Sequence, residues 1–293
     1  MMDVREALGP KSNFKYNIFF LSACGIWPLQ SKSSKVIFGF LWITQEFIIT
    51  GAESIKLVEI YKEIDLLLEA LPPFIYNRLN DIVFANGMIN QHKMKILLRK
   101  IQNHWDSLTD ESEIQILAKT VKFGMLINVG FIGMVYSALW SCMLLPLLPL
   151  VLDIVQPLNE SRPLKPLFMC EFFVDPDKYY FTILAQNYMS ALASPLPLVG
   201  MDLFFINCCN HICGIIGILG FRIDNITKNE ALNKECKSTY KQLCKCMDMH
   251  QIIFDFCDSI NDTFSTNFLV MLFINMSLMS FTGVAVSRLF QEL

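Results

Sequence analysis

Three long stretches of the chain contain no Asp, Glu, Lys or Arg. They cover residues 123–152, 179–201 and 264–287, which are 30, 23 and 24 residues long. A helix needs roughly 20 residues to cross a hydrocarbon layer about 30 Å thick, so each stretch is long enough to span a membrane. The pattern predicts membrane helices over about 122–152, 179–206 and 264–288.

Two earlier stretches predict two more spans, at about 36–56 and 68–91. The first is interrupted by Glu46 and the second by Glu69, Arg78 and Asp81. On hydropathy alone, each also fits an amphipathic helix that lies against the other three. The charge of the connecting segments favours five spans.

The number of Lys and Arg residues alternates between high and low in successive connecting segments. They number five, two, six, three and six in residues 1–35, 53–69, 92–122, 153–178 and 222–262. Basic residues favour the cytoplasmic side of a membrane, so the alternation predicts a cytoplasmic amino terminus. Residues 153–178 then form an outer loop, in which Asn159 begins an Asn-Glu-Ser sequence that predicts glycosylation.

Residues 17–29 follow Lys11 and Lys15 and resemble the apolar region of a signal peptide. Cleavage after this region would reverse the charge alternation. A cytoplasmic segment that lies at the membrane surface or dips into it agrees with the alternation, with Trp27 and Pro28 at the level of the lipid headgroups. Residues 1–35 are therefore predicted as a cytoplasmic segment, and residues 36–293 as the transmembrane domain.

Two predicted helices are longer than a membrane is thick. Residues 179–227 contain no strong helix stop, although Pro195 and Pro197 should kink the path. A helix of this length extends about 65 Å, twice the hydrocarbon thickness. A second long helix is predicted from near Leu243 to Phe290. Residues 92–121 and 207–262 should therefore form helical cytoplasmic extensions, so the fold class is an all-α membrane bundle with a cytoplasmic anchor.

Composition agrees with a membrane protein and excludes several other classes. Hydrophobic residues make up 53% of the chain and charged residues 17%, and soluble domains carry about 25% charged residues. The mean hydropathy is +0.42, which excludes a disordered chain. The formal net charge of −3 argues against a partner nucleic acid, because such proteins need a basic face.

Signals for catalysis, cofactors and metals are absent from the sequence. No HExxH, GxSxG or P-loop pattern occurs, and Gly214, Gly217 and Gly220 fit close helix packing better than phosphate binding. Cysteine and histidine crowd in two places, but neither spacing matches a zinc pattern; these are Cys208, Cys209, His211 and Cys213, and Cys236, Cys244, Cys246 and His250. We expect no enzyme activity, no cofactor and no metal site.

Aromatic and small polar residues gather in the predicted outer halves of the helices. An aromatic cavity with a few hydroxyl groups suits a small, mostly apolar ligand. The alternative for each residue is ordinary packing or a place in the aromatic belt at the membrane surface. The candidate ligand-binding residues are Phe74, Tyr76, Gly133, Tyr136, Ser137, Trp140, Met143, Tyr180, Leu184 and Tyr188.

Several short motifs, in this order and spacing, resemble the insect odorant receptor family. They are Gly25-Ile26-Trp27-Pro28, Phe172-Phe173-Val174-Asp175 with Tyr179-Tyr180, Cys209-Asn210-His211, and residues 250–257 (HQIIFDFC) leading into Phe264-Ser265. The resemblance covers essentially the whole chain. It implies a receptor in the plasma membrane of sensory neurons, which binds small volatile odorants and gates a cation channel as a heterotetramer with a shared co-receptor.

The same resemblance implies seven helices, of which this chain contains about five. The long helices four and five would extend into the cytoplasmic anchor, and Gly133, Tyr136 and Trp140 match pocket-facing positions of the third helix by location. Two more helices are expected after Leu293, so the chain is expected to be a truncated receptor that does not form a complete channel by itself.

Two other functional classes compete with the receptor. A small multi-span solute transporter would show internal repeats and helices interrupted at matching places, and only Pro195 and Pro197 suggest this. A membrane-bound enzyme would need a cluster of His or carboxylate residues within the spans, whereas Glu46, Glu69 and Asp81 are scattered.

Overall fold

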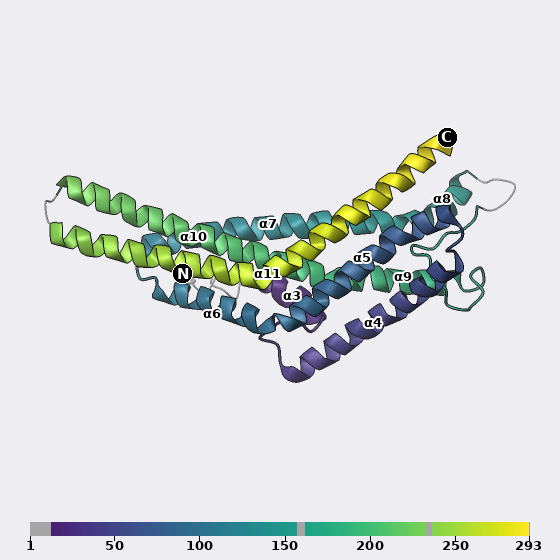
Figure 1. The fold of residues 1–293 in the computed structure, drawn as a ribbon, viewed down its shortest axis with the longest axis horizontal. Helices are drawn as coiled ribbons and strands as arrows, with labels where there is room; N and C mark the ends of the chain where they lie inside the picture. The colour runs from purple at the N-terminus through teal and green to yellow at the C-terminus, as the bar shows by residue number, and fades with distance from the viewer. Residues whose placement is uncertain (1–12, 157–161, 233–235, 293) are drawn as a thin grey trace.

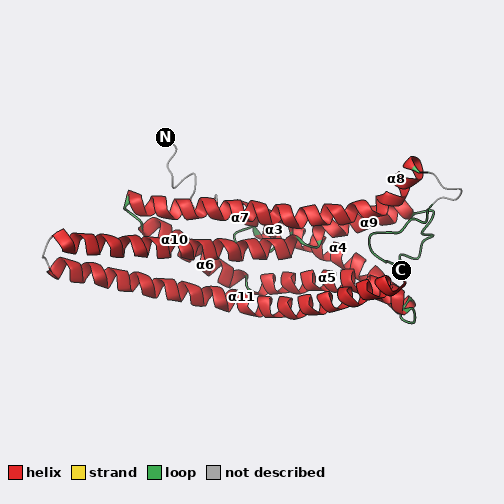
Figure 2. Ribbon diagram, turned by 90° about the horizontal axis from the view of Figure 1, so that it is seen from above, coloured by secondary structure: helices red, strands yellow, loops and turns green. Residues whose placement is uncertain are grey.

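The computed structural model describes residues 13–156, 162–232 and 236–292, and these residues form an elongated bundle of helices (Figures 1 and 2). This confirms the predicted all-α bundle. The helices are α3 (Lys15–Ala23), α4 (Lys32–Glu59), α5 (Ile64–Ile89), α6 (Gln91–Ser107), α7 (Glu111–Leu144), the short 3-10 helix η1 (Leu145–Leu147), α8 (Leu148–Val155), α9 (Tyr180–Ala193), α10 (Leu196–Leu232) and α11 (Cys236–Glu292).

The two ends of the bundle differ, and we name them by their elements. At the stem end, α10 and α11 run side by side as an antiparallel pair, with α6 beside them (Figure 1). At the loop end lie α8 and the irregular segment 162–179. The carboxyl end of α11 also reaches the loop end, so this single helix connects both halves of the molecule.

Local sequence accounts for where several helices begin and break. The side chain of Ser31 accepts a hydrogen bond from the Ser34 amide at the start of α4, and Asp110 accepts one from Ser112 at the start of α7. Such N-caps satisfy amide groups that lack a partner within the helix. Pro195 divides the predicted helix over 179–227 into α9 and α10, because proline cannot continue the hydrogen-bond ladder.

Four helical segments are long and apolar enough to cross a membrane: Lys32–Glu59, Glu111–Val155, Tyr180–Lys228 and Thr239–Val284. The last three contain 45, 49 and 46 residues, about twice what a bilayer requires. They must therefore project beyond the membrane. Helix α5 carries Glu69, Arg78 and Asp81 and is not among the four, so the fifth span stays a prediction.

The amino-terminal helix α3 is buried inside the bundle. It packs against α10 and α4, and Leu21 and Ile26 are fully buried. The Trp27 ring is 6% exposed and contacts the rings of Phe14 and Phe204, with centroids 6.5 Å away in each case. Tertiary packing therefore covers this side chain, and its depth at the level of the lipid headgroups stays a prediction.

A chain of buried asparagine side chains holds α3, α7 and α10 together. Nδ2 of Asn128 donates to Oδ1 of Asn207 at 2.8 Å, and Nδ2 of Asn207 donates to Oδ1 of Asn17 at 2.6 Å. Asn17 in turn donates to the Gly200 carbonyl at 3.1 Å. Asn17, Asn128 and Asn207 are each 0% exposed. Amide groups that pair across helices in this way fix how the helices are arranged.

The loop end is tied to α4 through its backbone. The amide of Glu171 donates to the Ala52 carbonyl at 3.0 Å. Asn159, the predicted glycosylation site, lies outside the described residues. The loop segment is therefore anchored on α4, and Nδ2 of Asn187 on α9 donates to its Phe168 carbonyl at 3.2 Å.

Candidate ligand-binding cavity

We call the halves of the bundle nearer the loop end and the stem end the loop half and the stem half. A cavity of about 420 Å³ lies in the loop half, and we call it the main cavity. Four helices and the loop segment contribute to its wall. The lining residues are Pro72, Pro73, Tyr76 and Asn77 from α5, Val135, Ala138, Leu139 and Cys142 from α7, Leu167 and Phe168 from the loop, Ala191, Ser194 and Pro195 at the α9–α10 junction, and Leu278 and Thr282 from α11.

Proline and alanine explain why the helices leave space here. Pro72 and Pro73 lie inside α5, where each removes a backbone donor and displaces the helix path. Pro195 begins the break between α9 and α10 on the opposite wall. Ala138 and Ala191 supply only a methyl group each where α7 and α9 approach the cavity. The cavity is thus made by interrupted helices and small side chains.

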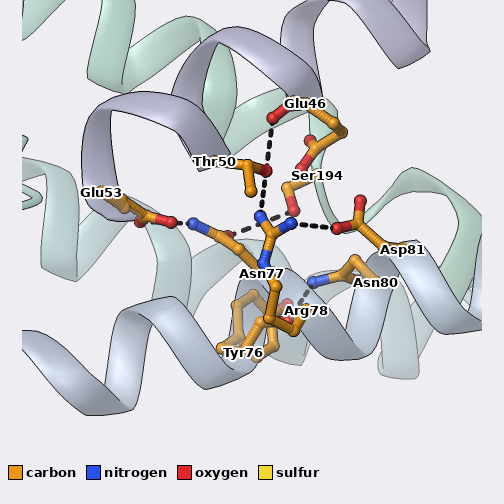
Figure 3. A network of polar contacts seen from close by, with 9 residues as sticks. All are labelled: Glu46, Thr50, Glu53, Tyr76, Asn77, Arg78, Asn80, Asp81 and Ser194. Carbon is orange, nitrogen blue, oxygen red and sulfur yellow. Dashed lines mark hydrogen bonds and ion pairs between the residues drawn. The ribbon is translucent and has the colours of Figure 1, made fainter. Parts of the chain in front are cut away.

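The polar groups at the cavity are largely paired within the protein. The Ser194 hydroxyl donates to Oδ1 of Asn77 at 3.3 Å, and Nδ2 of Asn77 donates to Glu53 at 2.7 Å (Figure 3). The Thr282 hydroxyl donates to the Leu278 carbonyl at 2.6 Å. A mostly apolar wall with a few hydroxyl and amide groups is typical of sites that bind small apolar molecules.

The structure places one of the ten predicted ligand residues, Tyr76, in the wall of the main cavity. On α7, the predicted residues lie on a helix face next to the one that lines the main cavity. Gly133, Ser137 and Trp140 are exposed on the side of the bundle, and Tyr136 stacks on Phe20 with ring centroids 5.9 Å apart.

The remaining predicted residues surround the main cavity without lining it. The Tyr188 hydroxyl donates to the Met143 carbonyl at 2.5 Å and therefore ties α9 to α7. Tyr180 donates to the Pro146 carbonyl at 3.1 Å, Leu184 is 4% exposed, and the Phe74 ring lies 5.3 Å from the Arg78 guanidinium. These hydrogen bonds and packing contacts hold the helices together, and a ligand role for these residues stays a prediction.

Several lining residues that the sequence did not single out are small or are prolines. Ala138, Ala191 and the proline pair of α5 carry no group that attracts attention as a ligand contact. The sequence signal for these residues was a small side chain or a proline on each of three helices. This signal can be used only when it is known which sides of the helices face one another.

Metal and nucleophile candidates do not assemble in the part of the chain that the structure describes. No group of three or more His, Cys, Asp or Glu side chains has the arrangement that holds a metal ion among these residues. His211 instead pairs with His104, with Nε2 and Nδ1 2.9 Å apart, and Cys208 is fully buried. A buried thiol of this kind behaves as a small apolar side chain.

The family model for the 7tm odorant receptors matches residues 63–292, which is most of the chain. The chain belongs to the odorant receptor family. This membership confirms the resemblance seen in the sequence motifs, and it agrees with a multi-pass membrane receptor. A comparison with curated protein sequences finds no match.

Solved structures of an insect olfactory receptor have a similar fold. The odorant receptor chain matches olfactory receptor OR5 from Machilis hrabei with a TM-score of 0.61 and 15% sequence identity, over 89% of this chain and 67% of that one. The same receptor in complex with eugenol matches with a TM-score of 0.61 and 16% identity, over 90% of this chain and 68% of that one. At this identity the likeness concerns the fold.

Proposed function

We propose that this odorant receptor binds small volatile, mostly apolar molecules in the main cavity. The observation that carries the proposal is the cavity itself, at about 420 Å³, with an apolar wall made by four helices. Tyr76, Ser194 and Thr282 provide hydroxyl groups at its surface, which suits a ligand with a single polar group. A similar fold is known with eugenol, a phenol, in complex.

Ligand binding is coupled to gating through α11 in this proposal. Leu278 and Thr282 bring α11 to the cavity, and the same helix continues without interruption to the stem end. A ligand that contacts α11 more favourably in one arrangement of the helices shifts the population toward that arrangement. The cation channel that responds is a heterotetramer with the shared co-receptor, in the plasma membrane of sensory neurons with a cytoplasmic amino terminus.

A cavity-filling variant tests the ligand site. Ala138 is exposed at the mouth of the main cavity, so Ala138→Phe adds a ring there without overpacking the buried core. We expect saturable binding of tritiated eugenol to the purified chain in lipid nanodiscs, and affinity at least about tenfold weaker in Ala138→Phe, since a tenfold change corresponds to about 1.4 kcal/mol.

The matched control is Met134→Phe, on the same helix at a side chain that is 64% exposed and outside the cavity wall. It should bind eugenol as the original chain does. Equal affinity in Ala138→Phe and Met134→Phe would contradict ligand binding in the main cavity.

Channel function requires a separate measurement. The chain is co-expressed with the insect odorant receptor co-receptor, and cation current is recorded while odorants are applied. We expect an odorant-evoked current that depends on the co-receptor and is reduced in Ala138→Phe. Current without the co-receptor, or solute uptake in place of current, would favour the transporter.

A further inference from the structure

A second cavity lies between α4 and α5, about halfway along both helices. Its volume is about 250 Å³, and we call it the side cavity. Four of its residues are polar and four are apolar: Glu46, Thr50, Arg78 and Asp81, and Trp42, Ile43, Phe47 and Phe84. Figure 3 shows the polar side chains converging from the two helices. Because α4 is long and apolar enough to span a membrane, these groups lie at membrane depth.

Most polar groups around the side cavity are already paired. Arg78 forms an ion pair with Asp81, at 2.5 Å, and donates a hydrogen bond to the Thr50 hydroxyl. The Thr50 hydroxyl donates its own proton to the Glu46 backbone carbonyl at 2.5 Å. The Ser194 hydroxyl faces the Glu46 side chain but donates to Asn77. Thr50 and Arg78 therefore do not donate to the Glu46 carboxyl group, whereas the Ser194 hydroxyl faces it.

Two groups in the wall of the side cavity lack a partner among the described residues. Glu46 is 3% exposed, and neither of its carboxyl oxygens has a hydrogen-bonding partner. Nε of Arg78 is likewise buried without an acceptor. Buried polar groups without partners cost free energy, and more so where no bulk water is available. A bound group that pairs with them would recover this cost.

The chemistry of the two free groups favours a ligand with a hydroxyl group. Glu46 needs a partner that can donate a proton, and Nε of Arg78 needs an acceptor. A hydroxyl group donates and accepts, whereas an ammonium group cannot accept and a carboxylate cannot donate. A hydroxyl group is also neutral, so its transfer into the membrane costs far less than that of an ion.

The other side chains of the side cavity require an apolar body and an approach from the lipid. The rings of Trp42 and Phe84 stack with centroids 4.2 Å apart and form one wall. Ile43 and Phe47 are 50% and 78% exposed at the edge of the cavity. On a membrane-spanning helix these exposed apolar side chains face lipid, so a molecule dissolved in the bilayer can reach the cavity directly.

We propose that the side cavity is a second ligand site, which takes a lipophilic alcohol or phenol from the bilayer with its hydroxyl group on Glu46 and its apolar body against Trp42 and Phe47. The side cavity and the main cavity are separate, but they share neighbouring residues. Asn77 and Ser194 line the main cavity, and Ser194 faces Glu46 from the other side. A ligand that binds Glu46 would therefore lie next to Ser194, which belongs to the wall of the main cavity.

Photolabelling of the 293-residue chain in lipid nanodiscs tests this site directly. The probes are an octanol that carries a photoreactive diazirine and the matching octane that lacks the hydroxyl group. We expect the alcohol to label residues 42–50 and 78–84 saturably, with competition by unlabelled 1-octanol. Glu46→Leu should weaken alcohol labelling about tenfold, as expected for loss of a hydrogen bond at a buried carboxyl group, and should leave octane labelling unchanged.

Two further variants keep the test decisive. Glu69→Leu makes the same change at an acid that is 51% exposed and outside the side cavity, and it should label as the original chain does. Ile43→Trp fills the edge of the cavity and leaves Glu46 intact, so it should reduce alcohol labelling even if Glu46→Leu folds poorly.

Three patterns of labelling would overturn the proposal, and so would the absence of labelling. They are equal labelling by the alcohol and the alkane, labelling confined to the main cavity, and labelling that survives both Glu46→Leu and Ile43→Trp. Absence of saturable labelling would mean that the side cavity holds water only, and it would also overturn the proposal. The readout uses neither eugenol nor channel current, so a failure here is distinguishable from a failure of the proposed function.

Discussion

The stem half and the loop half of this odorant receptor differ in how their helices meet. In the stem half, large apolar side chains of α3, α6, α7, α10 and α11 form one continuous core, which includes Leu21, Met94, Ile101 and Phe204 at 0% exposure. In the loop half, helices interrupted by proline enclose the main cavity and are joined by hydroxyl groups on backbone carbonyls, such as Tyr188 on Met143.

The two halves of the bundle therefore have different mechanical properties. A close-packed core resists changes in volume and transmits displacement between helices. A hollow region joined by a few hydrogen bonds can adapt to ligands at low cost. Changes in the stem half should therefore reduce stability strongly, and equivalent changes in the loop half should reduce it weakly.

The largest effect is expected at Gly25, in the turn after α3. Its φ is +78°, and a Cβ atom there would lie 2.6 Å from the Lys35 carbonyl oxygen and 2.8 Å from the Gly39 amide nitrogen. A β-branched residue is strongly disfavoured at this φ, and backbone atoms cannot move aside. Gly25→Val should cost about 4 kcal/mol or more, measured as loss of monodisperse protein in size-exclusion chromatography.

Gly51→Ala is the control, because a Cβ atom at that helical position meets nothing within 4 Å. It should leave the yield unchanged or improve it, since alanine favours helix over glycine by about 1 kcal/mol. Normal yield of Gly25→Val would contradict the close contact between the α3 turn and α4.

The asparagine chain should give the next largest effect. Asn207→Leu leaves Nδ2 of Asn128 and Oδ1 of Asn17 without their partner, and a buried group without a partner costs about 1–3 kcal/mol. We expect a lower thermal midpoint of unfolding in detergent. Asn103→Leu, at an exposed position of α6, should leave the midpoint almost unchanged. Equal midpoints in both variants would contradict a stabilising role of the asparagine chain.

A pH effect of intermediate size is expected in the stem half. Burial of the His104 ring lowers its pKa below the usual value of 6.5, and nearby Lys100 lowers the pKa further. As pH falls through 6.5, the unfolded chain binds a proton that the folded chain does not bind, so stability decreases toward acid pH. The thermal midpoint should be lower at about pH 5.5 than at about pH 7.5, as the pKa range of histidine implies.

Substitution isolates the contribution of His104. His104→Gln should show a smaller decrease in the midpoint between the two pH values, whereas His92→Gln, at an exposed position, should behave like the original chain. An identical pH dependence in all three chains would assign the effect to other groups.

The smallest effect is expected in the loop half. Tyr188→Phe keeps the ring and removes the hydrogen bond to the Met143 carbonyl, so it should cost about 1 kcal/mol or less. Tyr179→Phe, at a ring that is 43% exposed, is the control and should leave the thermal midpoint unchanged. A loss as large as that of Asn207→Leu would remove the distinction between the two halves.

Membrane character and family could be predicted from the sequence, because both depend on local properties. The charge-free runs at 123–152, 179–201 and 264–287 need a bilayer whatever their neighbours are. The Pro195 break is also a local property of the backbone. The short motifs at Gly25–Pro28 and residues 250–257 similarly led to the odorant receptor family, which the match over residues 63–292 confirms.

The candidate site depended on contacts between helices, which the sequence does not specify. An α7 face bearing Tyr136 and Trp140 looked suited to ligands, but Ala138 and Cys142 on the neighbouring face line the main cavity. In a membrane, lipid-facing and helix-facing stripes are both apolar, so hydrophobic periodicity cannot distinguish them. The sequence by itself therefore determined a membrane-spanning odorant receptor, and only the tertiary structure decided which side chains enclose its cavities and which buried groups, such as Glu46, lack a partner.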